Sequence, residues 1–145
     1  MFFLLRLHHY ANMFKNIVVT SALNLNFHMV RCASSSLNGE ELVRDGGVHL
    51  LATLLSRCMG VVQPTTPGNE PSAIIVTNIM QTFSVLSQFE AARAEILDFS
   101  GLVEDIVHCT EFELVPAAVD AALQTIANVS VSSELQDALL KAGVL

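Results

Sequence analysis

The sequence has few charged residues, no tryptophan and a single tyrosine. Charged residues make up 14% of its 145 positions, whereas hydrophobic residues make up 52%. Disordered chains combine low hydrophobicity with high charge, so this composition predicts that most of the chain folds. The length suits one domain with a real hydrophobic core and is too short for several.

Basic residues are scarce beyond residue 39. Residues 40–145 carry fourteen acidic residues against four basic ones, so their net charge is −10. Proteins bind nucleic acid largely through Lys and Arg side chains that neutralise phosphates and release counterions. The charge pattern therefore argues against nucleic acid as a partner and would favour a basic protein surface through electrostatic complementarity.

Cysteine is also scarce, and its three copies follow neither a CxxC nor another metal-binding spacing: Cys32, Cys58 and Cys109. An odd number without such spacing predicts reduced thiols in a cytoplasmic setting. Asn128-Val129-Ser130 matches a glycosylation sequon, but it falls on an expected helix. We interpret that match as chance.

Residues 1–35 lack acidic side chains, yet they lack a well-formed targeting segment too. Three basic or titratable residues interrupt the first apolar run after five positions: Arg6, His8 and His9. A secretory signal needs an unbroken apolar core of about 7–15 residues, and a membrane span needs about 20. We predict a poorly ordered segment or partial helix here. An amphipathic transit peptide stays open as the alternative.

No alternating apolar and polar run long enough for a sheet is present, so an all-α fold is predicted. Shifting the sequence by 43 positions places residues 81–87 on residues 124–130. That shift lies within the roughly 40–47-residue period of armadillo and HEAT repeats. Residues 36–145 are therefore predicted to form an armadillo/HEAT-like helical repeat, truncated at both ends.

A short helix end, a glycine and a new apolar helix recur in three segments, at residues 42–48, 96–102 and 139–144. Glycine adopts the left-handed conformation that ends many helices, which lets the chain turn sharply. A loop is expected over residues 60–72 because Pro64, Pro67 and Pro71 punctuate it. Helices are expected at residues 39–45, 48–59, 73–87, 89–99, 101–109, 116–130 and 132–142. Because the last unit lacks a third helix, we expect its apolar face to be partly uncovered at Leu135, Leu139 and Leu140.

The chain resembles the receptor-mediated-endocytosis DnaJ-domain proteins, which include the plant gravitropism-defective members. The resemblance covers about residues 32–145 and depends on four short segments, with Arg93 and Ile96 following them: Gly46-Gly47-Val48-His49-Leu50-Leu51, Leu54-Leu55-Ser56-Arg57-Cys58, Phe83-Ser84-Val85 and Gln88-Phe89-Glu90. It implies a large peripheral endosomal protein of armadillo-like helices around a J domain, acting in endosomal sorting and vacuolar or lysosomal trafficking.

In that family the J domain recruits an Hsp70 partner through a His-Pro-Asp tripeptide. No histidine precedes any of the four prolines of this sequence: Pro64, Pro67, Pro71 and Pro116. The resemblance therefore implies contact with Hsp70 only through a J domain absent from these residues. It also implies membrane association that is at most peripheral and indirect.

The residue patterns predict no catalytic, cofactor or metal site. His108-Cys109 with Glu111 and Glu113 could suggest a Cys-His nucleophile or a metal cluster, but adjacent helical side chains point about 100° apart. The paired acids 40–41 and 104–105 are interpreted as solvated or first-turn helix residues. Cys58 and Cys109 are interpreted as small core residues at helix ends, and His49 as a packed or half-exposed helix residue. Two weaker candidates remain. One is His8-His9 as a metal-binding pair, and the other is Ser34-Ser35-Ser36 as a phosphate acceptor.

The leading hypothesis is a non-catalytic protein-interaction scaffold in the cytoplasm, associated with endosomes through the parent protein. No cofactor is expected. The alternative is a small organelle-targeted or membrane-tethered helical protein that uses residues 1–35 as its targeting segment. An enzyme would require base, nucleophile and orienting group within mutual reach, for which the sequence gives little support.

Overall fold

The computed structural model describes residues 36–144, and every regular element in that range is helical. Seven α-helices and one 3-10 turn follow one another: α3 (Ser36–Arg44), α4 (Gly47–Met59), α5 (Pro71–Leu86), α6 (Glu90–Asp98), α7 (Leu102–His108), η1 (Cys109–Glu111), α8 (Pro116–Val129) and α9 (Ser133–Lys141). The predicted all-α helical repeat is confirmed. The segment 1–35, with its targeting alternatives, lies outside the described residues.

The 43-residue repeat is visible in the helix bounds and in the hydrogen bonds. It carries α6 onto α9 and the last residue of α5 onto the last residue of α8. The Ser87 amide donates to the Phe83 carbonyl, and the Ser130 amide donates to the Ile126 carbonyl. The equivalent helices α5 and α8 therefore end in the same backbone turn.

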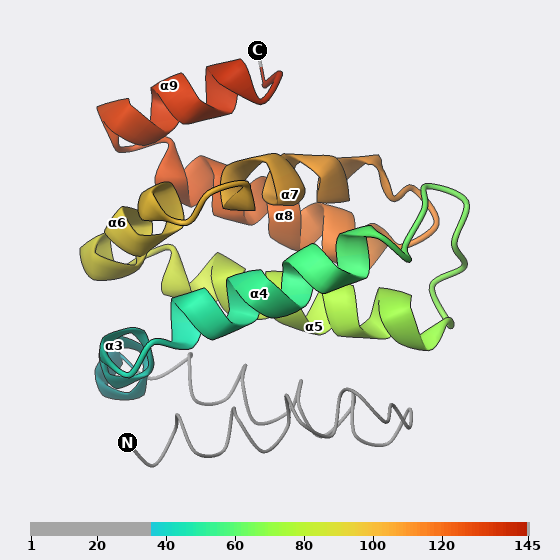
Figure 1. Ribbon diagram of the computed structural model, residues 1–145, viewed down its shortest axis with the longest axis horizontal. Coiled ribbons are helices and arrows are strands. Elements are labelled where there is room, and N and C mark those ends of the chain that lie inside the picture. The colour runs from blue at the N-terminus through green and yellow to red at the C-terminus, as the bar shows by residue number, and fades with distance from the viewer. Residues whose placement is uncertain (1–35, 145) are drawn as a thin grey trace.

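Equivalent helices of successive repeats pack side by side. Helix α5 contacts α8, α4 contacts α7, and α6 contacts both α3 and α9. In Figure 1 the long helices α5 and α8 lie behind α4 and α7, while α3, α6 and α9 follow one another along the left side. The repeat therefore forms three parallel stacks, as in a helical solenoid.

Glycine makes the turn from the second helix to the third. Among the described residues, positive φ values occur only at Gly46 (86°), Gly101 (85°) and Gly143 (98°). A residue with a Cβ atom is strained in this region, whereas glycine is not. One glycine in each of the three predicted corner segments thus has the expected conformation.

Proline begins the first helix of each described repeat. Pro71 and Pro116 lie at the first turns of α5 and α8, where a missing N–H leaves no hydrogen bond unmade. The predicted loop was therefore too long, because Pro71 and Ser72 belong to α5. The fixed φ of proline suits the start of a helix as well as a turn, so the local sequence did not show whether Pro71 ends the loop or begins the helix.

The core is continuous through the repeats. Its largest fully buried side chains include Phe83, Phe112, Leu51, Leu55 and Ile79. The expectation for α9 was wrong at two of three positions, since Leu135 and Leu139 are 1% and 4% exposed while Leu140 is 60% exposed. Contacts of α9 with α6, α7 and α8 cover the first two side chains.

Within the part of the chain that the structure describes, none of the helices combines the length and apolarity required to span a membrane.

Candidate interaction surface

The two cysteines of the described residues face the core. Cys58 is 3% exposed and Cys109 is fully buried. Burial raises the pKa of each thiol to about 12, and the charges of Asp105 and Cys58 add to the effect at Cys109. Because the thiolate is the nucleophilic form, neither side chain has the chemistry of a reactive cysteine at neutral pH.

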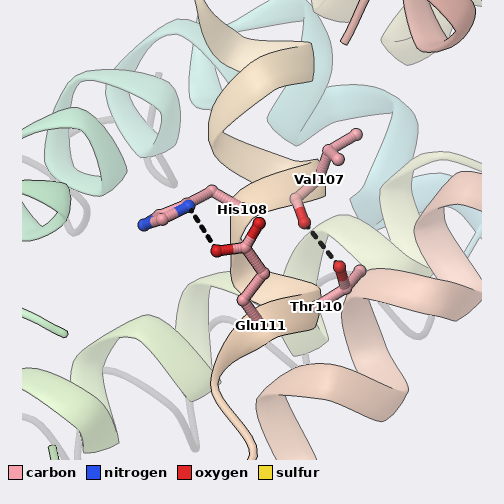
Figure 2. Close-up of polar contacts among 4 residues, drawn as sticks. All are labelled: Val107, His108, Thr110 and Glu111. Atoms are coloured by element: carbon pink, nitrogen blue, oxygen red, sulfur yellow. Dashed lines mark hydrogen bonds and ion pairs between the residues drawn. The ribbon is translucent and has the colours of Figure 1, made fainter. Parts of the chain in front are cut away.

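His108 lies next to Cys109 in sequence but occupies a different environment. Its Nδ1 atom is 3.3 Å from Oε2 of Glu111, and both side chains are substantially exposed. Figure 2 shows these two side chains pointing toward one another, while the Thr110 hydroxyl donates to the Val107 carbonyl at 2.6 Å. The imidazole ring also meets the Phe112 ring edge to face. This arrangement is that of a helix end with a surface contact between His108 and Glu111 rather than of a thiol and its base.

The remaining candidate residues are dispersed. The pair at residues 40–41 lies inside α3 rather than in its first turn, whereas Glu104 and Asp105 do lie in the first turn of α7. Burial, followed by the charge of Glu104, raises the pKa of Asp105. Within residues 36–144, no three His, Cys, Asp or Glu side chains gather as metal ligands would. His8, His9, Ser34 and Ser35 lie outside the described residues, and Ser36 only begins α3.

Two repeat-equivalent clefts separate the helices of the α3, α6 and α9 stack. The first, of about 530 Å³, lies between α3 and α6 and is lined by Glu40, Arg44, Glu90 and Glu95 among others. The second, of about 550 Å³, lies between α6 and the start of α9. The same stacking step therefore produces a cleft at each of these two helix boundaries.

The α6–α9 cleft combines charge with exposed apolar surface. Glu90 and Glu134 line it, and so do Leu97 and Val131, which are 38% and 69% exposed. Arg93 also lines it, but its guanidinium donates to the Ser87 and Gln88 carbonyls at the end of α5. The cation is thus used to hold the α5–α6 turn, which leaves the cleft rim acidic.

A third cleft, of about 490 Å³, lies where the α3–α4 corner meets the end of α6. Its lining includes Gly46, His49, Glu95, Asp98 and Phe99. The rings of His49 and Phe99 meet edge to face with centroids 4.9 Å apart. Burial raises the pKa of Glu95, the charge of His49 lowers it, and the charge of Asp98 raises it. The cleft therefore places two carboxylates beside an aromatic surface.

One side chain joins the two repeats by direct hydrogen bonds. The Asn128 Nδ2 atom on α8 donates to the Ser84 carbonyl at 2.9 Å and to Ser87 Oγ at 3.0 Å on α5. Sequence reasoning treated Asn128 only as part of a chance sequon. The 43-residue shift gave no signal for this contact, because it places Asn128 on Val85.

The clefts also escaped prediction, since each combines residues from two repeats. The exposed acidic side chains were expected as a solvated face, and the structure brings several of them together at the helix boundaries. Only the glycine corners gave a hint, because Gly46 lines the third cleft with open space beside its Cα atom.

Comparison with known proteins gives one informative match. Over 114 residues, or 79% of its length, the chain is 75% identical to DnaJ homolog subfamily C GRV2 of Arabidopsis thaliana. The chain spans 4% of that protein's length. No family model matches the chain, and no solved structure matches it.

Proposed function

This chain belongs to the same family as the Arabidopsis DnaJ homolog GRV2, and from that premise we propose that residues 36–144 act as a non-catalytic protein-binding scaffold in endosomal sorting. That relative is a DnaJ homolog, which supports membership of the chain in a DnaJ-containing protein. The sorting role comes from the resemblance of the corner and helix-end segments to the endocytosis family. The proposal includes vacuolar or lysosomal trafficking as its cellular outcome.

The observation that carries the scaffold role is the row of clefts along α3, α6 and α9. Each cleft is open to a partner, lies at a boundary between stacked helices and is lined by carboxylates. Stacked repeats often bind partners through such extended surfaces. Acidic rims would attract a basic partner surface and set its orientation more than its raw affinity.

The proposal places the chain in the cytoplasm, on endosomes, through protein partners rather than through lipid. In this scheme Hsp70 is reached only by a J domain outside these residues, and membrane contact is peripheral and indirect. No cofactor, metal or nucleic acid takes part in this scheme. The net charge of −10 over residues 40–145 would repel the phosphates of a nucleic acid.

Proximity labelling in plant cells tests the proposal. The full chain, carrying a labelling enzyme at its C-terminus, should enrich endosomal sorting proteins. The double variant Glu95→Lys, Asp98→Lys should lose most of that set, because it reverses the charge of the third cleft. The matched control is Glu104→Lys with Glu113→Lys, two exposed acids that do not line this cleft.

Two results would count against the scaffold role. Equal labelling by the cleft variant and the control would separate partner binding from the clefts. Enrichment of plastid or mitochondrial proteins that disappears on deletion of residues 1–35 would instead support an organelle-targeted protein.

A further inference from the structure

The outward face of α8 repeats a surface that α5 already uses for binding a helix. Exposed residues follow one another along α8 at helical spacing and continue just past its end: Ala117, Asp120, Gln124, Ala127 and Val131. On α5, the first four equivalent positions are half-buried: Ile74, Thr77, Gln81 and Ser84. The α5–α8 contact is the most extensive among the described helices.

The hydrogen-bond acceptors of the α5 face are repeated too. On α5, Asn128 donates to the Ser84 carbonyl and to Ser87 Oγ, and the same hydroxyl donates to that carbonyl at 3.4 Å. A shift of 43 residues places the Ala127 carbonyl and Ser130 Oγ at the corresponding positions of α8. There the Ser130 hydroxyl donates to the Ala127 carbonyl at 2.7 Å. The Ala127 carbonyl and the Ser130 hydroxyl are thus arranged like the Ser84 carbonyl and the Ser87 hydroxyl.

Exposed apolar side chains border this face. Leu123 on α8 is 52% exposed, whereas Met80, its equivalent on α5, is fully buried. Val131, just after α8, is 69% exposed. Because burial of apolar area is the main favourable term in association, covering Leu123 and Val131 would favour a helix seated here.

We propose that the outward face of α8 is a docking site for the first helix of a further repeat, and that this helix carries an asparagine. The asparagine amide donates to the Ala127 carbonyl and to Ser130 Oγ, as Asn128 does to Ser84 and Ser87. The interface continues the α5–α8 contact by one more step. It shares only Val131 with the α6–α9 cleft and does not depend on the scaffold's partners.

The chain itself supplies a repeat with which to test this. Gly143-Val144-Leu145 resembles Gly101-Leu102-Val103 in sequence, and both glycines have positive φ. Appending residues 104–145 after Leu145 of the full chain therefore adds a second copy of the last repeat behind an equivalent corner. The added asparagine, a copy of Asn128, should meet the Ala127–Ser130 acceptors. We expect the melting temperature to rise by about 5 °C or more, since repeat arrays gain stability from each neighbour interface.

Substitution of the face distinguishes docking from mere length. Ala127→Arg changes an exposed alanine, so it should leave the melting temperature of the unextended chain within about 2 °C. In the extended chain it should abolish the gain, because an arginine side chain would separate the two helices. Ser56→Arg, at an exposed position of α4 that lines none of the three clefts, is the control and should preserve the gain.

Three outcomes would overturn the proposal. The first is an appended repeat whose amides exchange like those of an unfolded tail. The second is an equal effect of Ala127→Arg on the extended and unextended chains. The third is self-association of the unextended chain, measured by sedimentation and removed by Ala127→Arg, which would assign this face to a second copy.

Discussion

Asn128 gives the sharpest test of how the repeats are joined. Its amide makes two hydrogen bonds to α5, at 2.9 and 3.0 Å, and Ser87 at the receiving end is fully buried. A typical hydrogen bond contributes about 0.5–1.5 kcal/mol net, so the pair contributes roughly 1–3 kcal/mol. We expect Asn128→Ala to lower the free energy of unfolding by about 2 kcal/mol.

Asn128→Asp is the more informative substitution because it keeps the size of the side chain. An ionised carboxylate cannot donate and would instead face the Ser84 carbonyl oxygen, so the loss at pH 7 should reach about 3 kcal/mol. The sign of the pH dependence follows. The folded state raises the pKa of the new carboxyl, so part of the stability should return as the pH falls through that raised pKa toward the ordinary aspartate value of about 4, because the protonated group can donate.

Urea unfolding followed by circular dichroism measures these changes. A double-mutant cycle with Ser87→Ala should give a coupling energy of about 0.5 kcal/mol or more, since the two side chains share a bond. Asp137→Asn, at an exposed position of α9, is the control and should change stability by less than about 0.5 kcal/mol. Additive energies in the cycle, or an Asn128→Asp chain as stable as the parent at pH 7, would refute the reasoning.

Three further predictions concern the corners and the thiols. Gly47→Ala should destabilise by about 3 kcal/mol in urea unfolding, because an added Cβ atom would lie 2.6 Å from the Leu42 carbonyl oxygen; Gly46→Ala, with open space but a φ of 86°, should cost only about 1 kcal/mol. The reverse order would contradict this account. Cys58 and Cys109 should resist iodoacetamide at pH 8 in the folded chain and react in urea, as measured by peptide mass spectrometry, since their pKa values are raised to about 12; rapid native labelling would disprove their burial. The free energy of unfolding should fall as the pH rises from about 9 toward 12, because the unfolded thiols lose protons first. If replacing both cysteines by alanine leaves that alkaline slope unchanged, the thiols are not its cause.

The candidate surface was predictable only in its charge. Fourteen acids against four bases over residues 40–145 indicated an acidic solvent-facing side and a basic partner. The clefts could not be located from this count, because each lies between helices of different repeats. The roles of Arg93 and Gln136 show the same limit. These two residues differ in charge but occupy equivalent positions. Arg93 donates to the Ser87 carbonyl, and Gln136 donates to the equivalent Ser130 carbonyl.

The sequence by itself determined the helical class, the 43-residue period and the corners. These follow from local physics: apolar spacing selects the helix, and glycine at residues 46, 101 and 143 permits a positive φ that other residues resist. Tertiary structure decided which side chains meet. Asn128 reaches Ser84 across 44 residues, and α9 buries Leu135 and Leu139 against three other helices. Such contacts depend on how whole helices stack, and no short stretch of sequence contains both partners.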